Sequence, residues 1–180
     1  MKTRIVIAMV LFSTFIVGCK NEKSVDSLDV VKPEVVEKIF QVTLDVVVKK
    51  NDDFALYYTQ DGTSDFKDAP IWMGVKGSDA SQKIVFNFPE NTVPTNIRVD
   101  FGMNKDQETM TINNYKMTYA GKSFEASGVN FFKYFKANEE CTQVDKEKSL
   151  IIPVKKEGKY FGPSFYPEQL ICDEIAKMVK

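Results

Sequence analysis

The sequence contains no histidine among its 180 residues. Without this side chain the protein cannot build a Ser-His-Asp or Cys-His catalytic arrangement, or the histidine-based metal sites of many hydrolases. It also lacks a G-x-S-x-G nucleophile motif, a glycine-rich phosphate loop and a dinucleotide fingerprint. Carboxylate chemistry remains, but no spacing of aspartate and glutamate singles out a catalytic pair. We therefore expect a protein that is not an enzyme and uses no cofactor.

Arginine is also scarce, because Arg98 is the only one after the first 18 residues. Basic and acidic residues are nearly balanced, with 24 Lys and Arg against 25 Asp and Glu. Nucleic-acid binding relies on a concentrated positive surface and on arginine side chains that read bases and phosphates. The composition therefore excludes nucleic acid as an expected partner.

The first 18 residues have the pattern of a signal peptide. Lys2 and Arg4 precede an apolar run over 5–17, which is shorter than the about 20 residues of a membrane-spanning helix. The run ends in Ile-Val-Gly-Cys at 16–19, which resembles the lipobox of bacterial lipoproteins. That resemblance implies cleavage after residue 18 and lipid attachment to Cys19. The alternatives are a buried N-terminal helix or a single-span anchor.

Residues 19–37 are polar and mixed in charge, and we expect a flexible tether. The Lys-Asn-Glu that follows Cys19 resembles export signals of Bacteroidetes-type lipoproteins. The resemblance implies a lipid-anchored protein of the bacterial cell envelope, held at the outer membrane and facing the periplasm or the cell surface. The first partner of the protein would be the lipid bilayer, into which the acyl chains on Cys19 insert.

The residues from 38 to 180 show the pattern of a β-sandwich. In the segment 39–50, apolar residues alternate with polar ones, and a second strand at 54–60 is expected to form a hairpin with it. Further short strands are expected at 71–76, 83–88, 96–102 and 109–121. In the last of these the alternation slips at Asn113-Asn114, which indicates a β-bulge.

Only the C-terminal segment 167–179 has a helical pattern. Its apolar face comprises Leu170, Ile171, Ile175, Met178 and Val179. Short strands with turn residues between them, followed by one helix, are typical of a mainly β protein. We predict an antiparallel β-sandwich or jelly roll against which the C-terminal helix packs.

The two cysteines outside the signal segment are Cys141 and Cys172. Outside the cytoplasm such a pair can form a disulfide, which would tie the C-terminal helix to the preceding segment. The alternative is two separate thiols, with Cys172 packed as a small apolar group. No metal site is expected, because two cysteines without histidine do not complete a zinc site, and the aspartates at 61, 65 and 68 lack the spacing of a calcium loop.

Aromatic residues supply the candidates for ligand binding. Trp72 is the single tryptophan and alternates with apolar neighbours, so it can lie on the exposed face of its strand. The adjacent Tyr57 and Tyr58 must point to opposite faces. Sugar rings stack on exposed aromatic faces, whereas most aromatic residues of a sandwich lie in its core. The segment 130–135, NFFKYF, can form either a buried corner or an exposed patch for a protein partner.

A strand reading IRVDFG, a polar loop and a second alternating strand, all within 86–119, resemble sandwich modules of bacterial envelope glycosyltransferases and carbohydrate-binding proteins. The resemblance implies a glycan ligand. The expected function is that of an envelope lipoprotein with a non-enzymatic binding domain. The alternatives are an assembly component of an envelope protein complex and a carboxylate-based glycan enzyme.

Overall fold

The computed structural model describes residues 38–155 and 160–180. The predicted signal peptide 1–18, the lipidated Cys19 and the tether 19–37 lie outside the described residues. The described part is mainly β, with two antiparallel sheets and a C-terminal helix, which confirms the predicted fold class.

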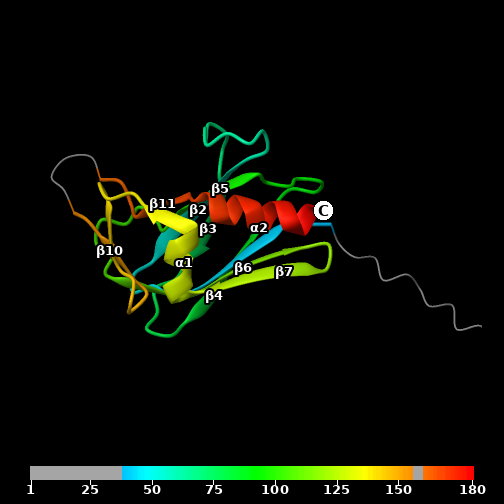
Figure 1. Cartoon of the computed structure of the whole chain (residues 1–180). Coiled ribbons are helices and arrows are strands. Elements are labelled where there is room, and N and C mark those ends of the chain that lie inside the picture. The colour runs from blue at the N-terminus through cyan, green and yellow to red at the C-terminus, as the bar shows by residue number, and fades with distance from the viewer. Residues whose placement is uncertain (1–37, 156–159) are drawn as a thin grey trace, which may run out of the picture. The chain divides into compact units, whose positions relative to one another are not determined.

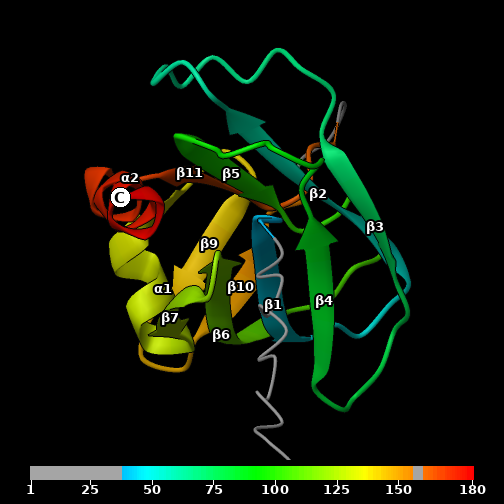
Figure 2. The ribbon, with the colours of Figure 1, turned by 90° about the vertical axis from the view of Figure 1, so that its right-hand side faces the viewer.

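Sheet A and sheet B face each other across the core (Figures 1 and 2). The strand order of sheet A is β4-β1-β6-β10-β9, and β7 also pairs with β6. Its strands are β1 (Gln41–Val47), β4 (Gln82–Asn87), β6 (Met110–Tyr119), β7 (Lys122–Ser127), β9 (Thr142–Asp145) and β10 (Leu150–Pro153). The strand order of sheet B is β3-β2-β5-β11-β8. Its strands are β2 (Asp52–Thr59), β3 (Ile71–Val75), β5 (Asn96–Asp100), β8 (Phe135–Ala137) and β11 (Ser164–Pro167).

The prediction that the first two strands form a hairpin is wrong. β1 pairs with β4 and β6, whereas β2 pairs with β3 and β5 in the other sheet. The turn at Asn51 therefore carries the chain from one sheet to the other. Each strand has one apolar face. These faces are buried when the two strands pack against each other across the core, just as they would be if the strands paired in one sheet.

The bulge predicted at Asn113 is confirmed. Asp45 of β1 lies opposite Asn114 of β6, and the next residue, Val46, lies opposite Ile112. Asn113 is therefore the extra residue on β6. Its Nδ2 donates hydrogen bonds to Asp45 Oδ1 at 3.1 Å and to Ser81 Oγ at 2.7 Å, which hold the irregular position on the outer face of sheet A.

The segment NFFKYF belongs largely to a helix that the sequence pattern did not predict, α1 (Gly128–Tyr134). One helical turn lets Phe131 and Phe132 both reach the core, where they are 0% and 8% exposed. The Phe131 ring stacks on Phe135 at 4.7 Å between centroids. Helix α1 starts at Gly128, where a Cβ atom would lie 1.8 Å from the carbonyl oxygen of Ile112. The segment is a buried corner and offers no exposed apolar patch.

The C-terminal helix is α2 (Gln169–Val179), two residues shorter at its start than predicted because Pro167 still belongs to β11. It contacts strands of both sheets, and in Figure 2 the two helices lie on the side of the sandwich away from β3 and β4. Ile171, Ile175 and Met178 are buried as expected. Leu170 and Val179 are exposed, so the apolar face is narrower than the predicted one.

Candidate functional site

The candidate site is the outer face of sheet B. Strand alternation turns Phe54, Leu56 and Tyr58 of β2 toward the core and leaves the residues between them on the outer face. In the ladder, Ala55 of β2 lies opposite Trp72 of β3 on one side and opposite Asp100 of β5 on the other. Strand pairing thus brings together residues that are far apart in the sequence.

Trp72 lies on the edge strand of this sheet, and its side chain is 50% exposed, as the alternation in the sequence predicts. It lines a cavity of about 940 Å³. Gly74, on the same face of β3, also lines it and leaves open space beside the indole. The remaining lining residues are predominantly polar, and they are Asn51, Asp52, Asp53, Val75, Lys76, Met103 and Asn104. We call this cavity the Trp72 groove.

One rim of the Trp72 groove is the loop after β5, which the Asp52 carboxylate holds in place. Asp52 Oδ1 accepts hydrogen bonds from the backbone N–H groups of Met103 at 2.7 Å and Asn104 at 3.1 Å. Its Oδ2 accepts one from Nε2 of the buried Gln107 at 2.9 Å. Gly102 has a φ of +90°, and a Cβ atom there would lie 2.1 Å from Asp52 Cγ. The rim is therefore fixed before any ligand binds.

Two charged groups in the Trp72 groove are unengaged. Within residues 38–155 and 160–180, neither the Asp53 carboxylate nor the Lys76 ammonium forms a hydrogen bond or an ion pair. Both residues are exposed. The groove therefore presents an aromatic face together with an acceptor and a donor that are free to bind hydroxyl groups.

Arg98 forms the second cluster on this face. Its guanidinium carbon lies 4.9 Å from the ring centroid of Tyr57 and 4.8 Å from that of Tyr166. Its Nε and Nη2 donate to the two oxygens of Asp100 at 2.8 and 2.7 Å. Phe66, from the loop between β2 and β3, packs against Tyr166 at 6.2 Å between centroids. The bidentate pair and the flanking rings hold the guanidinium plane in one orientation.

Asp100 is more buried than its place on the polar phase of β5 suggests. Its side chain is only 19% exposed, and each of its carboxylate oxygens accepts one hydrogen bond from Arg98. Burial raises the pKa of the Asp100 carboxyl, and the hydrogen bonds from Arg98 offset this only in part. Burial opposes the charge of Arg98 as well, but the hydrogen bonds and attraction of Asp100 leave the Arg98 pKa raised.

The three aromatic residues proposed for ligand binding separate into two groups. Trp72 and Tyr57 lie on the outer face of sheet B. Tyr58 lies on the opposite face, where its ring packs against Phe88 at 4.9 Å between centroids, so it does not join the site. Sequence reasoning missed Tyr166, whose strand enters the sheet from the far end of the chain. It also did not connect Arg98 with the aromatic residues.

Cys141 and Cys172 are free cysteines, so the disulfide considered from the sequence is not formed. Each sulfur has neighbours of its own. The Cys141 Sγ is buried 3.5 Å from Ser164 Oγ, and the Cys172 thiol donates to Asn96 Oδ1 at 3.0 Å. Burial raises the pKa of the Cys172 thiol, with a further contribution from the charge of Asp173.

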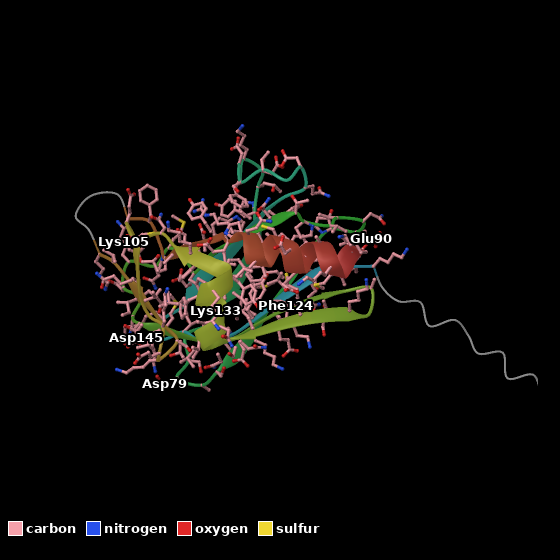
Figure 3. The ribbon with its side chains drawn as sticks, in the orientation of Figure 1. Asp79, Glu90, Lys105, Phe124, Lys133 and Asp145 are labelled. Carbon is pink, nitrogen blue, oxygen red and sulfur yellow. The ribbon has the colours of Figure 1, made fainter. Side chains whose placement is uncertain are left out.

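Charged residues of both signs are spread over the surface, and the labelled Asp79, Lys105 and Asp145 lie at its periphery (Figure 3). In the aspartate-rich loop, Asp61 Oδ1 accepts hydrogen bonds from the backbone and hydroxyl of Thr63, and Asp65 pairs with Lys67. Within the part of the chain that the structure describes, no group of three His, Cys, Asp or Glu residues is arranged to hold a metal ion.

Neither of the described helices has the length and apolarity that crossing a membrane requires. No protein-family model matches this chain, and no curated protein or solved structure matches it either.

Proposed function

We propose that this protein is a lipid-anchored lipoprotein of the bacterial cell envelope whose β-sandwich binds a glycan on the outer face of sheet B. The observation that carries the glycan proposal is the position of Trp72. Its indole is half exposed, on the outer face of an edge strand, in a groove with free polar side chains.

The chemistry of the Trp72 groove suits a sugar. A sugar ring has an apolar face that stacks on an indole, and hydroxyl groups at its edge that both donate and accept hydrogen bonds. Asp53 supplies a carboxylate acceptor and Lys76 an ammonium donor, and both residues line the groove. Because the loop at Met103 is fixed by Asp52, binding would order few new side chains, which favours affinity.

The glycan proposal is tested on an array of bacterial and host glycans probed with the full chain in detergent. We expect retention of a defined set of glycans, and loss of that set when Trp72→Ala is probed in parallel. Failure to retain any glycan, together with recovery of a specific envelope protein by crosslinking in cells, would favour the assembly alternative.

The anchor rests on the sequence 16–19, which lies outside the described residues. Attachment of a diacylglyceryl group to Cys19 supplies two acyl chains, enough for stable membrane binding. We expect Cys19→Ala to abolish both labelling with a palmitate analogue and retention in the membrane fraction. Cys172→Ala is the matched control and should be labelled like the wild type. Undiminished labelling of Cys19→Ala would refute the assignment.

A further inference from the structure

A second cavity lies beside the Trp72 groove on the same side of sheet B. It has a volume of about 360 Å³ and is lined by the Arg98 cluster and by residues of the neighbouring loops. Met103 lines both cavities, and its side chain is exposed between them. A ligand longer than one ring can therefore extend from the Trp72 groove over Met103 to Arg98.

The Arg98 cluster still has hydrogen-bonding capacity. A guanidinium carries five N–H donors, and the pair with Asp100 uses only Nε and one position on Nη2. Nη1 has no hydrogen bond to any described residue. Each Asp100 oxygen accepts one hydrogen bond from Arg98 and has a second lone pair available. Donors and acceptors thus lie side by side in one plane, an arrangement that matches neighbouring hydroxyl groups of a sugar.

The charges around the two cavities select against anionic ligands. Four carboxylates line them (Asp52, Asp53, Asp100 and Glu140), and only two cations do (Lys76 and Arg98). One of these cations, Arg98, is already neutralised by Asp100. A polyanionic glycan would meet net repulsion along this face, whereas an uncharged one would not.

From these observations we infer that the Arg98 cluster, with Tyr57, Asp100 and Tyr166, is a second sugar-binding subsite, and that the ligand is an uncharged linear oligosaccharide spanning both cavities. This inference rests on the proposed glycan-binding function and adds the length and charge of the ligand to it.

The test is calorimetric titration of the full chain with a ladder of neutral oligosaccharides, from the monosaccharide upward, of the type retained on the array. We expect the affinity to rise with length until both cavities are filled. Arg98→Lys keeps the charge but loses the planar, bidentate geometry. This variant should lose the increase in affinity with ligand length, which we expect to be about tenfold in the wild type. Its affinity for the shortest ligands should stay unchanged.

Glu140→Arg is a second variant that does not disturb the Arg98–Asp100 pair, because the Glu140 side chain is exposed at the rim of the smaller cavity. The larger arginine side chain should obstruct long ligands only, and the melting temperature of the variant should equal that of the wild type.

The charge of the ligand is tested separately. A uronic-acid polymer should bind the wild-type chain more weakly than its neutral counterpart does.

The outcomes separate the two proposals. A wild-type chain that binds no oligosaccharide of any length would overturn the proposed function and this inference together. Equal affinity for all lengths, unchanged length dependence in both variants, or tighter binding of the uronic-acid polymer would overturn this inference alone.

Discussion

The outer faces of the two sheets differ in a way that the shared architecture does not require. On sheet A the outer side chains are polar and bonded to one another: Gln41 donates to Asn87 at 2.8 Å, and Lys116 pairs with Glu125 at 2.7 Å. On sheet B the outer face carries Trp72, two tyrosines and a largely shielded ion pair beside two cavities.

Both faces cover the same core, so the core does not explain why one of them carries aromatic residues. A half-exposed indole forgoes part of the stabilisation that its full burial would give, and burying much of an arginine and an aspartate costs desolvation free energy. A face that keeps such groups is a better candidate for binding than one whose polar groups satisfy each other.

The largest expected effect is on Trp72. Truncation of a tryptophan at the centre of a binding site costs about 2 kcal/mol or more, which is about 30-fold in affinity. We expect Trp72→Ala to weaken glycan binding by at least that factor, measured by titration calorimetry. Thr43→Ala, on the outer face of sheet A, is the control and should bind normally. Equal binding by both variants would remove the distinction between the two faces.

Gly74→Val tests whether the open space beside Trp72 is used. A Cβ atom at this position would meet only Asp53 Oδ1, at the ordinary distance of 3.5 Å, and a β-branched residue suits a strand. The melting temperature should therefore stay the same or rise, while affinity falls about tenfold because the new side chain fills the groove. Retained affinity would place the ligand elsewhere.

Asp100 links the second cluster to pH. Because its pKa is raised in the folded protein, its contribution to stability is fully present below the unfolded value of about 4, and is lost as the pH rises through the raised pKa. The free energy of unfolding of the wild type, minus that of Asp100→Asn, should therefore fall as the pH rises from about 4 through the raised pKa. Urea titrations at several pH values measure this, and a difference that does not vary with pH would contradict it.

The smallest effect is expected on sheet A. Gln41→Ala removes an exposed hydrogen bond to Asn87 and should change the free energy of unfolding by less than about 0.5 kcal/mol, with no change in glycan affinity. A clear loss of binding in this variant would show that the polar face also takes part in recognition.

The sequence predicted the strands β1 to β6, most of them from the alternation of their apolar residues. It also predicted the bulge at Asn113, because an extra residue shifts the alternation. It did not predict β7 or the short strands β8–β11. The latter have only three or four residues each, which are too few to show a period. Helix α1 was missed because its seven residues make only about two turns, which is too short to show a helical period.

The candidate site could be predicted only in part, for a similar reason. Exposure of Trp72 follows from alternation within one strand, and the opposite directions of Tyr57 and Tyr58 follow from their adjacency. The Arg98 cluster depends on β2, β5 and β11 being neighbours, and β11 lies more than 60 residues after β5 in the chain. Two features of the sequence could have indicated this cluster. Arg98 is isolated from other arginines, and it lies two positions before Asp100, which places both side chains on one face of their strand.

Trp72 provides the most direct measurement, since it is the only tryptophan and its fluorescence reports on the groove alone. The full chain would be titrated with a neutral oligosaccharide retained on the array, with iodide or acrylamide as quencher. Binding over the indole predicts a saturable shift of the emission to shorter wavelength and a loss of quenching. Emission and quenching that stay unchanged while calorimetry shows the site to be saturated would contradict the placement of the ligand on the outer face of sheet B.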